Sequence, residues 1–486
     1  MHKQSIAFIE PVGSASNVFE NYMRLPLMGT LYLGTILHNC GHEVHIYNEN
    51  ILPRPIDPFD IKADVFCISA LTVSANRARI LAHEIRRIYP HARVIIGGIH
   101  ASLSPETFED VADHIVYGEA EGLIVDLVQG RIADKHVHGK PVQDLDELPL
   151  VNYSLLENSA SIDVIPLMTS RGCPFDCNFC TVTKVFGKKF RMQSPQRILR
   201  EIQNALSYFS TNVFFFYDDN FTANRKRVAE LCRDIEEADI DIEWVTQVRS
   251  DIARHPELLS SMAKAGCRFF FIGFESISDA TLKAMHKSQT RTDIEKAVGV
   301  IRAQGISIHG MFIFGDDNDT PESIQATVDF AIQHHIDTVQ FMILTPFPGT
   351  RYYADIARQK RLIHQRWDYF NAMYAVFRPA QMSPSRLQEE TIKAYTRFYS
   401  LRRLSVDVLR FIINITVDAL TWNFSRAFNY SLDTMFLKAG ARFLIGRYAQ
   451  AFEGYLAFLH KIEQEAVLEN ASDSTISRET TIPLHQ

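Results

Sequence analysis

Cysteine, tryptophan and long apolar stretches are scarce in this chain of 486 residues. Seven cysteines in 486 residues are too few for the disulfide-rich scaffold of a small secreted domain. No run of about 18 uncharged apolar residues occurs, so a membrane-spanning helix is not expected. The first residues lack the apolar stretch and cleavage site of a secretory signal, which favours a cytoplasmic protein. The formal net charge of −7 gives no sign of a nucleic-acid partner.

Three of the cysteines lie together in the segment RGCPFDCNFC, residues 171–180. Cys173, Cys177 and Cys180 have the spacing C-x3-C-x2-C. Three thiolates can hold three irons of a [4Fe–4S] cluster and leave the fourth iron open to bind a substrate. Two alternatives are three buried structural cysteines and a zinc site. Zinc usually takes four Cys or His ligands, and the nearest further cysteines, Cys232 and Cys267, are distant in the sequence.

Residues 1–140 alternate short apolar runs with helical patterns, which predicts a parallel, doubly wound α/β sheet, a Rossmann-like domain. The expected strands are 5–11, 43–49, 63–71, 92–98 and 112–119, and the expected helices include 31–41 and 76–90. Ligands of such sheets bind at the carboxyl ends of the strands. The candidate ligand-binding residues at these ends are Gly13, Ser14, Ser74, Gly97, Gly98, His100, Gly118 and Glu119. The alternatives are a domain that binds nothing and, for His100, a surface position.

Residues 141–160 are polar and contain two prolines, which is typical of a linker. Six strand–helix units follow in residues 161–380. Six such units predict a partial (β/α)6 barrel, in which chemistry takes place at the carboxyl ends of the strands. Asp218 and Asp219 end the second strand, Arg249 ends the third, and Glu275 ends the fourth. Their alternative roles are a helix N-cap for the aspartates, an ion pair with Asp251 for Arg249, and a structural contact for Glu275.

From residue 381 the pattern becomes helical and rich in aromatic residues and arginine. Residues 397–447 contain seven Arg and one Lys against three Asp. We expect a helical domain over residues 381–468 that covers the barrel, and the alternative is peripheral contact with a membrane surface or a lipid-like substrate. The polar residues 469–486 are expected to be disordered.

The cysteine motif, with Phe179 before its last cysteine, resembles the signature of the radical S-adenosylmethionine (radical SAM) enzymes. The segments PLMGTLYLGTIL, GHEVHIYN, VIIGGIHAS and IVYGEAEG, in this order, resemble the cobalamin-binding domain that precedes many radical SAM barrels. The chain departs from the methionine-synthase-like motif D-x-H-x-x-G, because Asp113 and His114 are adjacent. The resemblance therefore implies cobalamin whose cobalt has no histidine from that motif.

The resemblance also implies roles for the strand-end residues. It implies that the open iron chelates SAM, that Asp218 and Asp219 contact the SAM amino group and that Glu275 binds the ribose hydroxyls. A guanidinium such as that of Arg249 can bind the SAM carboxylate through two hydrogen bonds. The cofactors implied are a [4Fe–4S] cluster, S-adenosyl-L-methionine and cobalamin.

The reaction implied is that of a class B radical SAM methylase, which methylates an unactivated carbon of a small-molecule or lipid-like substrate. In such a reaction one SAM methylates cobalt, and a second is cleaved to a radical that activates the substrate. The alternatives are a cyclisation, ring contraction or rearrangement on the same scaffold and, in another class, a cobalamin-binding sensor without catalysis. An electron donor such as flavodoxin or ferredoxin is expected as a partner.

Overall fold

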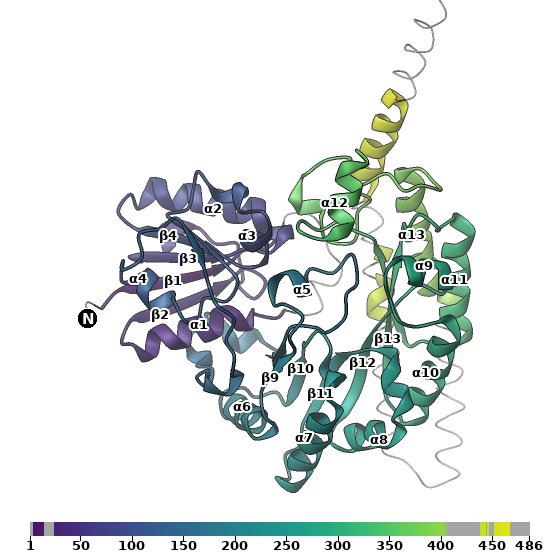
Figure 1. Cartoon of the computed structure of the whole chain (residues 1–486), viewed down its shortest axis with the longest axis horizontal. Coiled ribbons are helices and arrows are strands. Elements are labelled where there is room, and N and C mark those ends of the chain that lie inside the picture. The colour runs from purple at the N-terminus through teal and green to yellow at the C-terminus, as the bar shows by residue number, and fades with distance from the viewer. Residues whose placement is uncertain are drawn as a thin grey trace, which may run out of the picture.

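The computed structural model describes residues 3–13, 24–403, 405, 438–443, 445–446 and 452–466. Two six-stranded parallel sheets lie side by side, one in the N-terminal third of the chain and one in the middle (Figure 1). The cysteine loop and the short helix α5 (Val182–Val185) lie between them (Figure 1). The predicted fold class, a Rossmann-like domain followed by a partial barrel and a helical region, is confirmed.

The first sheet has the strand order β2-β1-β3-β4-β5-β6, and all its neighbours are parallel. Its strands are β1 (Ser5–Glu10), β2 (Glu43–Asn48), β3 (Val65–Ser69), β4 (Arg93–Gly97), β5 (His114–Tyr117) and β6 (His136–His138). Its helices are α1 (Met28–Asn39), α2 (Ala75–Ile88), α3 (Ile99–Leu103) and α4 (Ile124–Val128), with 3-10 turns η2 (Pro58–Asp60), η3 (Thr72–Ser74) and η4 (Pro105–Phe108). The chain direction across the sheet reverses between β1 and β3, so a switch point for ligand binding lies at their carboxyl ends.

Helix α1 begins three residues before the predicted start because its first amide groups are bonded from outside the helix. The Leu27 amide donates to the Glu10 carboxylate (3.0 Å), and the Met28 amide donates to the Tyr217 hydroxyl of the barrel (2.8 Å). The first amides of a helix have no partner within it and need one elsewhere. The start of α1 is therefore set by tertiary contacts, which the local sequence pattern does not contain.

The second sheet has the order β14-β13-β12-β11-β10-β7, again with all strands parallel. Its strands are β7 (Ile165–Leu167), β10 (Val213–Phe216), β11 (Glu243–Val248), β12 (Cys267–Glu275), β13 (Ser307–Phe314) and β14 (Thr338–Ile343). Its helices are α6 (Pro195–Tyr208), α7 (Arg225–Glu237), α8 (Pro256–Lys264), α9 (Asp279–Ala284), α10 (Arg291–Ala303), α11 (Pro321–Gln333) and α12 (Arg351–Arg358). The chain order of the strands is their order in the sheet, as in a barrel, and within the described residues β7 and β14 do not pair.

A small antiparallel ladder was not predicted from the sequence. It joins β8 (Ser170–Arg171) to β9 (Arg191–Met192) and brackets the cysteine loop between them. Strands of two residues are too short to show an alternating pattern, so nothing local marks them.

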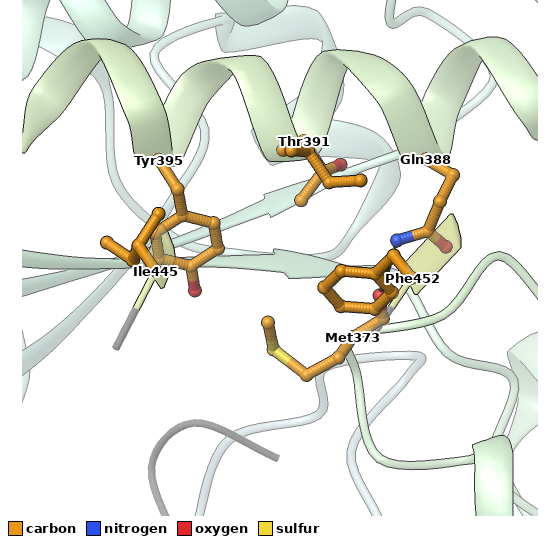
Figure 2. A pocket seen from close by; sticks show the side chains of 7 residues that line it. Met373, Gln388, Thr391, Tyr395, Ile445 and Phe452 are labelled. Atoms are coloured by element: carbon orange, nitrogen blue, oxygen red, sulfur yellow. Dashed lines mark hydrogen bonds between the residues drawn. The ribbon is translucent and has the colours of Figure 1, made fainter. Parts of the chain in front are cut away.

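Helix α13 (Pro384–Phe398) covers the β14 edge of the barrel. The Phe341 amide donates to the Tyr395 hydroxyl and the Val339 amide to the Tyr399 hydroxyl, each over 2.9 Å. These bonds occupy amides that an edge strand would otherwise leave open. Residues 445 and 452–466 continue the helical cover. The cavity below α13 is apolar and has a volume of about 10 Å³, which leaves room for one water molecule at most (Figure 2).

The remaining C-terminal predictions lie partly outside the described residues, namely at 406–437 and 469–486. Membrane contact through these helices and the exact domain boundaries stay predictions. Within the part of the chain that the structure describes, no helix combines the length and the apolar character needed to cross a membrane.

Candidate functional site

The three predicted iron ligands lie on one loop, residues 172–190, at the carboxyl end of the second sheet. None of the three cysteines forms a disulfide, and each is partly buried. Burial raises the pKa of all three thiols, that of Cys180 to about 12. Iron binding must therefore displace the thiol protons.

The chemistry of the donor set fits an iron–sulfur cluster, because three free cysteine thiols lie on one loop and a cubane held by three thiolates keeps one iron open. Among the described residues, no three Cys, His, Asp or Glu side chains are arranged to hold one ion. In a cubane each thiolate binds a different iron, so the sulfur atoms stand farther apart than the ligands of zinc.

The cysteine loop is held by hydrogen bonds and ion pairs to residues that follow β12 and β14 of the barrel. The Asn178 amide donates to the Met285 carbonyl (3.4 Å), and its side-chain Nδ2 donates to the Ala284 carbonyl (3.1 Å). Asp176 forms ion pairs with Arg351 (3.0 Å) and Lys188 (3.2 Å). The end of α9 and the start of α12, which follow β12 and β14, thus hold the loop that carries the thiols.

The two predicted aspartates at the end of β10 have different surroundings. Asp218 is buried and accepts hydrogen bonds from the Thr169 amide and hydroxyl (both 2.5 Å) and from the Ser170 amide (3.1 Å). Asp218 therefore positions the strand that leads into the cysteine loop. Asp219 is exposed, and its charge adds to burial in raising the pKa of Cys173 and Cys180.

The helix that follows these aspartates is capped by another residue. The Asn224 side chain accepts from the amide of Arg227 (3.0 Å), so neither Asp218 nor Asp219 is the N-cap of α7. Of the two aspartates, Asp219 is the one whose carboxylate is open toward the thiols.

Arg249 lies where a guanidinium can reach a ligand at the cysteine loop. Its guanidinium carbon is 3.7 Å from the centre of the Phe175 ring, between Cys173 and Cys177. The alternative ion pair with Asp251 is long, 3.9 Å between Nε and Oδ1. Arg249 is 8% exposed, and its buried Nε has no hydrogen-bond partner. A buried donor without a partner is costly, and a bound carboxylate would supply the missing acceptor.

Glu275 forms a buried ion pair that the sequence analysis missed. Its Oε1 is 2.6 Å from Nζ of Lys287, and both side chains are 8% exposed. Its backbone is left-handed, with φ +62°, which a non-glycine residue adopts only under strong constraint. Both charges act on Cys177, so this pair lies beside the cysteine loop. Lys287 follows α9 rather than a strand, and no sequence signal marked it.

The glycine residues of the first domain shape the carboxyl edge of its sheet. A Cβ atom at Gly13 would lie 2.8 Å from the Val73 carbonyl oxygen, so glycine lets the loops after β1 and β3 meet at the switch point. Gly98 has φ +95°, and a Cβ there would lie 2.7 Å from the Ala70 carbonyl oxygen. Gly97 and Gly118 end β4 and follow β5 on the same edge. These glycine residues therefore allow the loops at this edge of the sheet to pack closely against one another.

Two polar residues predicted at this edge, Ser74 and His100, are hydrogen-bonded to other protein groups. The Ser74 hydroxyl bonds to the Leu71 backbone in its own turn. His100 is fully buried, with Nε2 3.1 Å from Thr107 Oγ1 and its ring 5.0 Å from that of Trp367. Burial lowers the pKa of His100 to about 4, so the ring is neutral. Ser14, also predicted here, lies outside the described residues.

Glu119, the last of the predicted cofactor-binding residues, is also occupied by protein groups. Its carboxylate binds Arg171 and Arg191 and accepts from the Val142 amide (2.9 Å). Burial opposes ionisation, but the two arginines outweigh it and lower the pKa of Glu119. In this structure Glu119 joins the first domain to the barrel.

The two candidate cofactor sites face one another. Helix α5, which follows Cys180, packs against α3, which follows Gly98 (Figure 1). The cysteine loop therefore lies over the carboxyl edge of the first sheet.

Two family models match the chain: the radical SAM superfamily over residues 167–331 and the B12 binding domain over residues 19–128. The chain is 29% identical to bacteriochlorophyllide d C-8(2)-methyltransferase of Chlorobaculum tepidum, in an alignment covering 74% of this chain and 83% of that protein. It is 25% identical to the anaerobic magnesium-protoporphyrin IX monomethyl ester cyclase of Rubrivivax gelatinosus, covering 70% and 66%.

The fold is similar to the solved structure of the cobalamin-dependent S-adenosylmethionine radical enzyme OxsB with aqua-cobalamin and S-adenosylmethionine bound. The TM-score is 0.66 at 15% identity, and the match covers 93% of this chain and 81% of that one.

The chain therefore contains a B12-binding domain followed by a radical SAM domain, as the sequence predicted. The predicted cofactors, a [4Fe–4S] cluster, S-adenosylmethionine and cobalamin, are confirmed with this assignment.

Proposed function

We propose that this enzyme transfers a methyl group to an unactivated carbon of an apolar small molecule. The observation that carries the proposal is the contact of α5 with α3, because it brings the cysteine loop to the cobalamin edge of the first sheet. A substrate between the two sites can meet both cofactors. The similarity to a methyltransferase over most of both chains supports the reaction class.

When bound, the cluster and SAM supply radical chemistry and cobalamin supplies the methyl carrier. The protein's own residues hold and orient these groups. Arg249 offers a buried Nε donor to the SAM carboxylate, and Asp219 offers an open carboxylate to the SAM ammonium group. Glu275, held by Lys287, faces the same space and can accept from the ribose hydroxyls. Asp218 orients the strand that leads into the cysteine loop.

The inner face of the barrel favours an apolar substrate. Phe215 and Phe271 lie in contact there, with 5.3 Å between ring centres, and His309 lies 4.9 Å from Phe271. Burial lowers the pKa of His309 to about 4, so the His309 ring is uncharged at neutral pH. Nearer the mouth, Met342 packs with Phe179 against a small apolar cluster. Partly exposed apolar groups around a site are typical of small-molecule pockets.

Anaerobic reconstitution with iron, sulfide and hydroxocobalamin tests the proposal. The protein is desalted, reduced and given S-adenosylmethionine with an isotope-labelled methyl group. We expect the protein to retain cobalamin and to form both S-adenosylhomocysteine and 5′-deoxyadenosine. Formation of S-adenosylhomocysteine should depend on cobalamin.

A matched preparation without cobalamin is the control. Formation of 5′-deoxyadenosine with bound cobalamin but without S-adenosylhomocysteine would contradict methyl transfer. That result would favour a cyclisation, the reaction named for the relative in Rubrivivax gelatinosus.

We also propose that a small one-electron carrier such as a flavodoxin or ferredoxin reduces the cluster, because reductive cleavage of SAM needs an external electron. Comparing SAM cleavage with each carrier, at matched concentration, against a chemical reductant tests this partner.

A further inference from the structure

Four charged side chains form a buried cluster at the junction of the two domains. Oε2 of Glu119 lies 2.7 Å from Nη1 of Arg171 and 2.9 Å from Nη1 of Arg191. Oε1 of Glu121 lies 2.6 Å from Nη2 of Arg171. All four side chains are at most 7% exposed. Two carboxylates thus balance two guanidinium groups away from solvent.

The two arginines occupy a particular position in the fold. Arg171 and Arg191 are directly opposite each other in the β8–β9 ladder, which is the base of the loop that carries the cysteines. Like charges directly opposite each other in a ladder repel, and burial increases the repulsion. The base of the cysteine loop can close only if carboxylates compensate the two charges. Both carboxylates come from the first domain, in the loop after β5.

The same cluster reaches a third segment. The Val142 amide donates to Oε2 of Glu119 (2.9 Å), and Arg191 donates to the Val142 carbonyl (2.5 Å). Arg191 also donates to the Phe186 carbonyl within the cysteine loop (3.3 Å). The segment between the domains is thereby tied to the same groups as the base of the loop.

We propose that Glu119 and Glu121 are positioning residues that fix the base of the cysteine loop to the B12-binding domain. They thereby set the separation of the cluster site from the cobalamin site. The proposal rests on the assignment of these two sites and not on methyl transfer or on the identity of the substrate. A buried ion pair adds little net stability compared with an apolar replacement, so fixing geometry is the role that its placement here supports.

Other contacts keep the domains together when this cluster is disturbed. The Met28 amide bonds to the Tyr217 hydroxyl, and Asn76 bonds to Asp368 (2.7 Å). A change at Glu119 is therefore expected to loosen the base of the loop without separating the domains. This separates a positioning role from a general contribution to folding.

The test uses the full-length protein with both cofactors loaded. Glu119→Gln keeps the shape of the side chain and removes its charge. The matched control is Asp126→Asn, which removes a carboxylate from an exposed ion pair with Arg131 in the same domain. Iron and cobalamin contents are measured first. The magnetic interaction between the reduced cluster and cob(II)alamin is then recorded by electron paramagnetic resonance, and amide hydrogen exchange is followed.

We expect Glu119→Gln to retain iron and cobalamin but to broaden and change the spin–spin interaction. Amide hydrogen exchange should become about tenfold faster both at Val142 and in residues 170–192. A rate increase of this size is expected when a charged hydrogen-bond partner is lost. Asp126→Asn should leave both measurements unchanged. A Glu119→Gln protein with both cofactors and a wild-type spin interaction would overturn the proposal.

Glu121→Gln covers the case in which Glu119→Gln does not fold, since it removes only one partner of Arg171. Glu121→Gln should give the same changes with a smaller magnitude. An unchanged electron paramagnetic resonance spectrum together with unchanged amide exchange in residues 170–192 would overturn the proposal. Failure of methyl transfer is a separate result, because S-adenosylhomocysteine formation is not part of either measurement.

Discussion

The mouth of the barrel and the ligand edge of the first sheet use their polar residues differently. At the barrel, Arg249 has a buried donor without a partner, and Asp219 is open toward the thiols. At the sheet edge, Ser74, His100 and Glu119 are bonded to protein groups. We propose that the first region binds its ligand through charge and through hydrogen-bonding groups that the protein itself does not use. We propose that the second region binds its ligand mainly through the shape of its closely packed loops, in which glycine residues are required.

This contrast predicts that single substitutions act differently in the two regions. Removing one charged or metal-ligating group at the barrel should abolish a specific interaction and leave the fold intact. Filling a glycine position at the sheet edge should displace backbone and reduce ligand retention by steric conflict.

The largest effect is expected for Cys177→Ala. A cubane held by three thiolates loses one of them, so the iron-dependent absorbance and all SAM cleavage should disappear. Both are measured after anaerobic reconstitution by the absorbance spectrum and by 5′-deoxyadenosine formation. The control is Cys40→Ala, because Cys40 is exposed and lies outside the motif. Retained SAM cleavage in Cys177→Ala would refute the assignment of the cluster.

Arg249→Ala should weaken SAM binding while the cluster absorbance persists. A charged, two-point hydrogen bond contributes about 1.5–3 kcal/mol, so the dissociation constant should rise on the order of ten- to a hundredfold. Arg249→Lys should be intermediate because an ammonium cannot form the planar fork. Equilibrium binding to the reconstituted protein measures the effect, with Arg254→Ala, an exposed neighbour, as the control. Loss of iron in Arg249→Ala would instead indicate that Arg249 holds the cysteine loop.

Gly98→Val should reduce cobalamin retention after desalting and leave SAM cleavage largely intact. A side chain at φ +95° costs about 1–2 kcal/mol, and its Cβ would press on the Ala70 backbone. Gly122→Ala is the control, since nothing lies within 4 Å of a Cβ at that position. Wild-type cobalamin content in a folded Gly98→Val protein would show that this loop does not border the cofactor.

Elements that rest on local patterns could be predicted from the sequence. Most strands of both sheets contain consecutive or alternating buried apolar residues, and the predicted strands overlap β1 to β5 of the first sheet and the six strands of the second. The cluster site could be predicted for the same reason, because the three cysteines are close together in the sequence.

Features that depend on distant partners could not be predicted. Glu119 binds Arg171 and Arg191, which are 52 and 72 residues away, so nothing near Glu119 marks it as an ion-pair residue. Adjacent Asp218 and Asp219 have the same chemistry, and only the packing of Thr169 against Asp218 separates their roles. Lys287 meets Glu275 through a turn after a helix, where strand alternation gives no guidance.

The smallest effect is expected for the pH dependence of stability at His100. Its pKa in the folded protein is about 4, below the ordinary value of 6.5, because the ring is buried. The unfolded chain therefore binds the proton first, and the stability contributed by neutral His100 is lost as the pH falls from 6.5 toward 4. Between pH 7.5 and 5.5 the loss should be about 1 kcal/mol for this residue. Denaturant unfolding of wild type and His100→Asn at the two pH values measures it, and the variant should lose that share of the pH dependence whatever its absolute stability. An identical pH dependence in both proteins would mean that His100 is accessible to protons in the folded state, and that the sheet edge is open where the structure closes it.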